Sequence, residues 1–262
     1  MSTASPITPL APSTTTATAA PRQPDDESHL EIDGVRYEFP RRAGRAEAIR
    51  LQYASPRKLE YVNGILYAMT GGSLPHGYVG VGLVVELATK LEGSECNVNG
   101  SDIKIAIDRE GQRQSIYPDV SVVCGPPESP DDDPAAVSNP VVLIEVLSPS
   151  TYRYDHTGKY DLVRAIPTAR EYLLVSQDRP CIERFVRDGT SWHFARATIG
   201  LDAVVTLTSL GVSLPLARIY RRVDFPEVTA EGDEHATGAD ADAASADNSE
   251  SSDSSSTNGA TS

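Results

Sequence analysis

The first apolar and polar alternation in the chain predicts a β-hairpin followed by a helix. Apolar residues dominate 59–62 and 65–69, which flank Asn63-Gly64, a dipeptide with a strong preference for a two-residue hairpin turn. Apolar positions 79, 83, 84, 87 and 91 then recur at helical spacing. This spacing predicts an amphipathic helix over 76–91.

Two strands are predicted next, over 103–107 and 115–123, around a turn at 108–111. Residues 141–147 form a nearly uninterrupted apolar run, which is typical of a strand that is buried on both faces. A short helix is expected over 156–166, with Asp155 as its N-cap and Pro167 directly after its end.

The remaining pattern predicts strands over 171–175, 181–186 and 192–195, the last two joined at Asp188-Gly189. The order is therefore β-hairpin, α, β, β, β, α, β, β-hairpin. This order predicts an α/β domain over 29–222, with a mixed β-sheet flanked by helices.

The two ends of the chain differ in composition from this middle part. Residues 1–28 are rich in Ser, Thr, Ala and Pro, and residues 223–262 are Ser-rich with ten acidic residues and no Lys or Arg. Both are expected to be disordered tails. The formal net charge of −14 comes from the ends, because residues 41–222 hold 21 acidic and 21 basic residues. The charge of the whole chain therefore does not exclude a nucleic acid partner.

The three cysteines, Cys96, Cys124 and Cys181, follow no metal-ligand spacing and are predicted to be free thiols in a reducing compartment. No apolar run approaches the roughly 20 residues that cross a bilayer. The N-terminus lacks the cationic start and apolar core of a secretory signal. A cytoplasmic protein without a membrane partner is the expectation.

Glu145 is the most informative residue of the pattern, because it is the one charged residue in the apolar run 141–147. A buried carboxylate without a partner costs several kcal/mol when it is ionised. Either a bound cation or a buried Lys or Arg must compensate it.

Asp119 is a second acidic residue in an apolar stretch, and it directly follows Pro118. A proline within a strand indicates an edge, a bulge or a strand start, and such irregularities can direct one side chain toward a site. Carboxylates on neighbouring buried strands repel each other unless a cation lies between them. Mg²⁺ or Mn²⁺ is the expected metal, with Asp119 and Glu145 as its ligands.

Lys159 is the third candidate. On the expected helix it shares a face with Leu162, Val163 and Ile166, the apolar positions that should face the sheet. A lysine directed at two carboxylates can balance their charge or orient a water molecule. The alternative is a side chain that extends along the surface to reach solvent.

These residues together resemble a known family. The segments that carry the resemblance are Tyr117–Val123, Ile144–Thr151, the helix with Lys159, Ile166–Val175 and Leu210–Leu216. They are similar in order and type to the Uma-type family of putative restriction endonucleases, which was long described only as a domain of unknown function and belongs to the PD-(D/E)XK nuclease superfamily. The resemblance extends from about residue 60 to residue 220.

The resemblance implies a restriction-endonuclease-like core, dependence on Mg²⁺ and hydrolysis of phosphodiester bonds. Asp119 matches the aspartate of the Pro-Asp motif, and Glu145 matches the acidic residue of (D/E)XK. Leu147 stands where the superfamily has its lysine. Lys159 matches the lysine that this family supplies from the next helix.

Three further residues are considered for the site. Glu60 matches a family glutamate and is expected as a catalytic residue, a further metal or water ligand, with a solvent-facing strand position as the alternative. Whether His76 or Glu86 joins the site is left open by the sequence.

The expected function is that of a metal-dependent endonuclease acting on nucleic acid, with DNA preferred as the substrate. The alternative is a nuclease fold without catalysis that binds nucleic acid or protein. The chain has no GxSxG, HExxH or Walker motif that would indicate another chemistry. The sequence leaves a homodimer open.

Overall fold

The computed structural model describes residues 28–225. Nearly all of the two predicted tails, residues 1–27 and 226–262, lies outside the described residues. The strands are β1 (His29–Ile32), β2 (Val35–Glu38), β3 (Arg41–Arg42), β4 (Leu59–Val62), β5 (Ile65–Ala68), β6 (Cys96–Gly100), β7 (Lys104–Arg109), β8 (Gln112–Ile116), β9 (Val120–Cys124), β10 (Ala136–Val137), β11 (Val142–Leu147), β12 (Glu171–Ser176), β13 (Cys181–Asp188), β14 (Ser191–Ile199), β15 (Val204–Leu207) and β16 (Val212–Pro215). The helices are α1 (Arg45–Ala54), α2 (Leu74–Lys90), α3 (Tyr152–Tyr154), the π-helix η1 (Asp155–Lys159), α4 (Tyr160–Ala165) and α5 (Leu216–Ile219).

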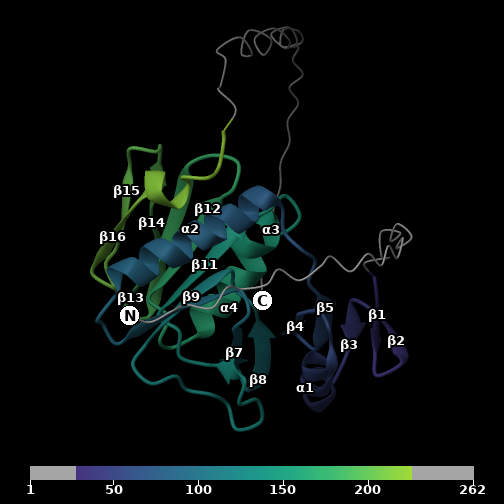
Figure 1. Ribbon diagram of the computed structural model, residues 1–262. Helices are drawn as coiled ribbons and strands as arrows, with labels where there is room; N and C mark the ends of the chain where they lie inside the picture. Colours follow the sequence, from purple (N-terminus) through teal and green to yellow (C-terminus); the bar gives the residue numbers. More distant parts are fainter. Residues whose placement is uncertain (1–27, 226–262) are drawn as a thin grey trace, which may run out of the picture. The chain divides into compact units, whose positions relative to one another are not determined.

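A mixed six-stranded sheet forms the centre of the described domain (Figure 1), in the order β14-β13-β12-β11-β9-β6. Strands β11 and β12 are parallel and are connected through α3, η1 and α4, whereas the other neighbouring strands are antiparallel. A second six-stranded sheet has the order β10-β7-β8-β4-β5-β3. The predicted α/β class, with mixed sheets and flanking helices, is confirmed.

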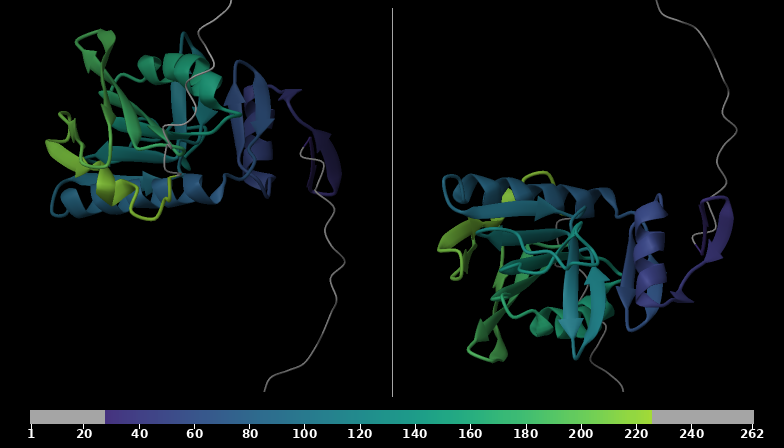
Figure 2. Two further views of the ribbon diagram at one scale, coloured as in Figure 1. Left: turned by 90° about the horizontal axis from the view of Figure 1, so that it is seen from above. Right: turned by 90° about the horizontal axis from the view of Figure 1, so that it is seen from below.

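Strand β11 packs against helices on both of its faces, as its continuous apolar sequence predicts. Val142, Ile144 and Val146 belong to a core cluster with α2, and Leu143 and Leu147 belong to a cluster with α4. Figure 2 shows α2 on one side of the central sheet and the helical segment of α3, η1 and α4 on the other. The strand that carries Glu145 is therefore covered on both sides.

Local sequence signals explain where several elements begin and turn. Asn63 and Gly64 have φ of 51° and 78°, the left-handed values that the tight turn between β4 and β5 requires. Ser73 is the N-cap of α2 and accepts a hydrogen bond from the His76 N–H. The predicted hairpin and first helix are confirmed to within two residues at their starts.

The predicted single strand over 115–123 is wrong. It consists of β8, which ends at Ile116, and β9, which begins at Val120, and the two strands belong to different sheets. Pro118 has no N–H for a strand ladder, and the Tyr117 N–H donates to Glu60 instead. The chain therefore leaves one sheet and enters the other around Pro118, and Asp119 directly precedes β9.

The predicted helix over 156–166 begins too late. Helical structure starts at Tyr152, and Asp155 lies inside it as the first residue of the π-helical turn rather than at an N-cap. The apolar face at Leu162, Val163 and Ile166 does pack against the sheet as predicted. Because the helix starts earlier, the side chain of Asp155 lies buried inside the domain.

The residues before β4 form structure that the sequence pattern did not predict. Strands β1 and β2 and helix α1 pack with β4 and β5 around a separate cluster that includes Leu30, Leu51, Leu59 and Leu66, and β3 pairs with β5. The short elements β6, β10, β15, β16 and α5 were also not predicted. Each of these elements has only two to five residues, which is too few to show a clear alternation of apolar and polar positions.

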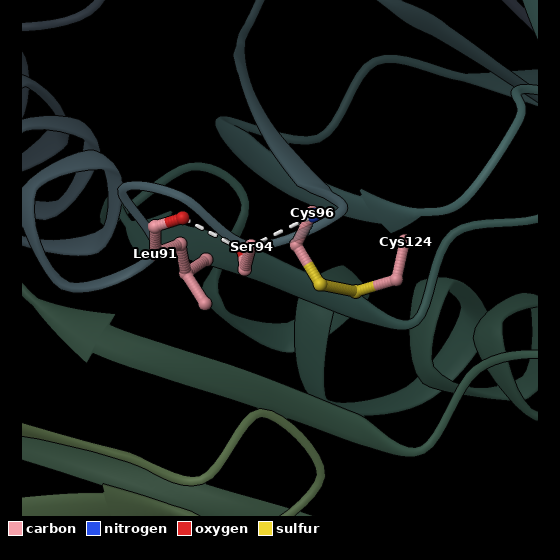
Figure 3. Close-up of a disulfide and its surroundings, with 4 residues drawn as sticks. All are labelled: Leu91, Ser94, Cys96 and Cys124. Carbon is pink, nitrogen blue, oxygen red and sulfur yellow. Dashed lines mark hydrogen bonds between the residues drawn. A yellow bond between two sulfur atoms is a disulfide. The ribbon is translucent and has the colours of Figure 1, made fainter.

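The expectation of three free thiols is wrong for two of them, because Cys96 and Cys124 form a disulfide (Figure 3). They are directly paired residues on the antiparallel strands β6 and β9. The Ser94 hydroxyl accepts a hydrogen bond from the Cys96 N–H and donates one to the Leu91 carbonyl. These bonds stabilise the turn that leads into β6. Cys181 is free and buried. Spacing along the chain cannot reveal such a pair, because the strand register creates it.

Reduction of this disulfide is expected to destabilise the domain. The two cysteines are 28 residues apart, so the bond should contribute about 3–4 kcal/mol by restricting the unfolded chain. We expect a lower melting temperature in excess reductant, measured by circular dichroism. A Cys96→Ser and Cys124→Ser double variant serves as the control and should show no further response to reductant. Equal melting temperatures with and without reductant for the wild type would contradict the expectation.

Among residues 28–225, no helix is both long and apolar enough to cross a membrane.

Candidate active site

A cavity of about 660 Å³ opens where the central sheet meets the start of α2 and the π-helical turn η1. It gathers side chains from segments that are far apart in the sequence. Its lining residues are Pro56, Arg57, Lys58, Met69, Thr70, Gly71, Gly72, Ser73, His76, Ser101, Asp119, Glu145, Val146, Ser148, Pro149, Ser150, Thr151, Asp155, Lys159 and Gln177. Three of the predicted site residues, Asp119, Glu145 and Lys159, are thus brought together.

Asp119 and Glu145 are neighbours through the register of β9 and β11. Val120 pairs with Ile144, so the next step of the antiparallel ladder places Asp119 beside Glu145. The Val146 N–H donates to Asp119 Oδ2 over 2.7 Å, which fixes this carboxylate at the end of the strand pair. The two acidic residues that the sequence singled out therefore line one cavity.

Glu145 is buried, with 3% of the residue exposed. Burial raises the pKa of its carboxyl well above the usual range, the ammonium of Lys159 opposes this rise, and the charges of Asp119 and Asp155 add to it. One oxygen, Oε2, lies 3.1 Å from Lys159 Nζ, whereas the buried Oε1 has no hydrogen-bond partner. An acceptor without a donor in such a place is suited to a cation.

Lys159 is equally buried and lies among three carboxylates. Its Nζ is 3.1 Å from Glu145 Oε2, 3.5 Å from Glu60 Oε1 and 3.8 Å from Asp155 Oδ1. Burial alone would lower the pKa of Lys159, but the three carboxylates outweigh burial and hold this pKa above its usual range. Lys159 points into the interior, and the alternative of a surface-directed side chain is wrong.

Asp155 is a cavity residue that the sequence pattern did not identify as part of a site. Its burial raises the pKa of its carboxyl, and Lys159 opposes this rise. Asp155 and Lys159 are four residues apart on η1, and π-helical turns often occur at functional sites. The spacing of four residues between Asp155 and Lys159 could have indicated in the sequence that the two side chains lie on the same helical face.

Glu60 is buried behind Lys159 and does not line the cavity. Its Oε1 accepts a hydrogen bond from the Tyr117 N–H over 2.9 Å and also faces Lys159 Nζ. The alternative of a solvent-facing position is therefore wrong. Glu60 connects the segment that leads into Asp119 with the lysine of the site.

His76 joins the cavity, a point that the sequence left open. Its Nε2 lies 3.2 Å from Asp119 Oδ2, and this interaction raises the pKa of the imidazole, although partial burial opposes the rise. Gly72 leaves room for this imidazole, because a Cβ at that position would lie 2.8 Å from His76 Nδ1 and His76 would have to shift. The first turn of α2 thus presents His76 to the carboxylates.

Glu86 lies outside the cavity, which answers the second open question. Its buried carboxylate accepts from the guanidinium of Arg218 over 3.0 Å and connects α2 with α5. Glu86 is therefore a structural residue of the helix interface.

The donor set of the cavity fits a hard divalent ion held by two carboxylates. Among the described residues, no three His, Cys, Asp or Glu side chains are grouped so as to hold a metal on their own. Mg²⁺, however, commonly binds one or two carboxylates and completes its shell with water and phosphate oxygens. Asp119 and Glu145, with the unpartnered Oε1, meet that requirement.

The fold and the cavity together define an α/β protein with two neighbouring carboxylates and a buried lysine in one cavity. Residues 46–217 match the family Uma2, whose description is "Putative restriction endonuclease". The chain belongs to this family, as the resemblance in the sequence implied.

Two proteins of a cyanobacterium are similar to this chain over most of their own length. The chain is 34% identical over 182 residues to the uncharacterized protein slr1290 of Synechocystis sp. (strain ATCC 27184 / PCC 6803 / Kazusa), an alignment that covers 68% of this chain and 92% of the relative. It is 26% identical to a second uncharacterized protein of that organism, sll1609, over 64% of this chain and 93% of the relative.

The fold also resembles a solved structure from Anabaena variabilis ATCC 29413, which is described as a putative nuclease belonging to DUF820. The TM-score is 0.51 at 16% identity, over 63% of this chain and 90% of the other. At this identity the likeness concerns the fold alone.

Proposed function

We propose that this protein is a metal-dependent endonuclease that hydrolyses phosphodiester bonds of nucleic acid, with DNA as its substrate. The observation that carries the proposal is the buried Glu145 carboxylate, which lies beside Asp119 in one cavity and has an oxygen without a hydrogen-bond donor. Membership of the family described as "Putative restriction endonuclease" supports the choice of DNA.

Asp119 and Glu145 are the proposed ligands of a Mg²⁺ or Mn²⁺ ion. Their position at the open end of β9 and β11 leaves the cavity side free for water and a phosphate oxygen. A bound ion of this kind supplies a water molecule of lowered pKa and offsets negative charge on the reacting phosphate.

Lys159 is the proposed partner of the attacking water and of the developing charge. Its ammonium lines the cavity and is held there by Glu145, Glu60 and Asp155. A fixed positive charge in a partly enclosed site needs no reorganisation when negative charge develops in the transition state. Glu60 and Asp155 act in this proposal by positioning Lys159.

A cleavage assay tests the proposal. Duplex DNA, single-stranded DNA and RNA are incubated with the full chain and Mg²⁺ or Mn²⁺, with a chelator in parallel. We expect cleavage of DNA that requires the divalent ion. Absence of cleavage on all three substrates would contradict the proposal.

The metal site can also be tested without activity. Mg²⁺ or Mn²⁺ should raise the melting temperature, because an ion present at 100 times its dissociation constant stabilises the folded state by about 2.7 kcal/mol. Asp119→Asn should remove this response and change the melting temperature in chelator only slightly. A wild-type melting curve that ignores millimolar metal would exclude a site of useful affinity.

The second candidate is a module that keeps the nuclease fold and binds nucleic acid or protein without cleaving it. Leu147 in place of a strand lysine favours this candidate. Binding of DNA with no cleavage under any metal, unchanged by Asp119→Asn, would support it over the first.

A further inference from the structure

The outward face of α2 is unusually apolar for a helix on a protein surface. Leu74, Tyr78, Val81 and Val85 are between 38% and 72% exposed, and Ala88 continues the same row. Within α2, Lys90 at the C-terminal end is the one charged residue that faces solvent, because Glu86 is buried against Arg218. A helix that is apolar on all sides is normally covered on all sides.

The spacing of this row has a further meaning. The steps between Leu74, Tyr78, Val81, Val85 and Ala88 are four, three, four and three residues. This is the spacing of the contact row in paired helices, where apolar residues repeat every 3.5 residues on average. The exposed row therefore has the pattern of a helix–helix contact, yet within the chain α2 uses its other face to pack on the sheet and α5.

The glycines of α2 give an independent indication. Glycine weakens a helix interior relative to alanine, so its presence calls for a reason. Gly82 has one, because a Cβ there would collide with the Ile219 carbonyl of α5. A Cβ at Gly77, next to the exposed row, would have no atom of residues 28–225 within 4 Å apart from its neighbours and the backbone of its own helix. Close approach of a second molecule would explain this glycine.

We infer that the exposed row of α2 is the contact surface between two copies of this chain. The row itself holds no charged side chain, so two copies of it are compatible with each other, whereas nucleic acid binding requires Lys and Arg. The two segments outside the described residues are poor in large apolar side chains. Residues 1–27 hold Met1, Ile7 and Leu10 as their large apolar residues, and residues 226–262 hold only Val228. A second copy brings an identical row.

A stable dimer needs a larger contact area than α2 alone can provide, so residues next to α2 must contribute to it. A helix of 17 residues is about 25 Å long, too small alone for the roughly 800 Å² per partner of a standard interface. The exposed Leu201 and Val204 lie next to α5, since Leu201 accepts from the Ala217 N–H and Val204 pairs with Pro215. Figure 2 shows α5 on the same side of the sheet as α2, so Leu201 and Val204 extend the surface beside Arg218, whose charge is paired with Glu86.

The dimer has a consequence for the candidate site. The first turn of α2 lines the cavity through Ser73 and His76. A contact through α2 therefore connects the cavities of two copies by one pair of helices. The inference does not depend on the proposed nuclease activity, and its test uses mass rather than cleavage.

Sedimentation of the full chain tests the inference. The wild type should sediment at about twice 28.1 kDa at micromolar concentration. Val81→Glu, at the centre of the row and 60% exposed, should raise the dissociation constant of the dimer at least tenfold and leave the melting temperature of the monomer unchanged. Val35→Glu is the matched control, because Val35 is 51% exposed on β2, and it should remain dimeric.

A second variant guards against misfolding of the first. Val81 occupies the middle of the row, so Val81→Cys should place two cysteines opposite each other and give a covalent dimer on mild oxidation. A wild type that is monomeric at every concentration, or a Val81→Glu variant as dimeric as the wild type, would overturn the inference. So would a monomer that binds phosphatidylcholine vesicles through Val81, since the face would then be a membrane contact.

Discussion

Replacement of Glu145 by glutamine is expected to abolish metal-dependent cleavage. The change keeps the shape of the side chain but removes the negative charge that the proposed ion requires. Residues that merely support metal ligands cost about 10–100-fold when they are changed, so a direct ligand should cost at least about 100-fold. The stabilisation by Mg²⁺ or Mn²⁺ should disappear with the activity.

The fold should tolerate this change. Burial and the charge of Asp119 disfavour the ionised form of Glu145, so a neutral side chain offsets part of the cost of losing the ion pair with Lys159. Lys159 keeps Glu60 and Asp155 as partners. We expect the melting temperature in chelator to remain close to that of the wild type.

Glu86→Gln is the matched control for this experiment. Glu86 is also a buried glutamate with one basic partner, but that partner is Arg218 and the residue lies outside the cavity. Its variant should cleave at the wild-type rate and respond to metal. Equal cleavage rates of Glu145→Gln and the wild type would rule out Glu145 as a ligand.

Replacement of Lys159 by alanine should have two large effects, one on stability and one on cleavage. Three carboxylates lose the cation that lies within 3.8 Å of each of them. Removal of one partner from a buried ion pair costs about 3–5 kcal/mol of unfolding free energy. Cleavage should fall with it, because no other described lysine lines the cavity except Lys58, which is paired with Asp102.

The measurement must separate lost stability from lost chemistry. Lys104→Ala provides the comparison, because Lys104 is the other buried lysine of the described domain and pairs with Asp133 over 2.8 Å. Both variants should melt at lower temperature, and only Lys159→Ala should lose cleavage at a temperature where both are folded. Mg²⁺ should still raise the melting temperature of Lys159→Ala. Full cleavage by this variant would assign activation of the water to another group.

Several parts of the fold could be predicted from the sequence because their signals are local. The turn at Asn63-Gly64 depends on the left-handed backbone of two residues, and the double burial of β11 follows from its unbroken apolar run. The orientation of Lys159 toward the sheet follows from helical spacing to Leu162 and Val163. Such patterns can be interpreted from a few adjacent residues, without knowledge of the rest of the chain.

Other predictions were wrong because the same short sequence pattern is compatible with two different local structures. An apolar run interrupted by Pro118 is compatible with one irregular strand or with two strands. The structure has two strands in different sheets, and between them the Tyr117 N–H donates a hydrogen bond to Glu60. Asp155 next to a helix start reads as an N-cap, although the helix in fact begins at Tyr152. Contacts with distant residues distinguish these alternatives.

The sequence by itself determined the α/β class, the family and the candidates Asp119, Glu145, Lys159 and Glu60, since apolar period and motif order are properties of the chain. Only the tertiary structure decided which side chains meet. Strand register placed Cys96 opposite Cys124 and Asp119 beside Glu145, and helix packing brought His76 and Asp155 to the same cavity. The physical reason is that register and packing depend on burial summed over many distant residues, whereas a period or a turn depends on a few adjacent ones.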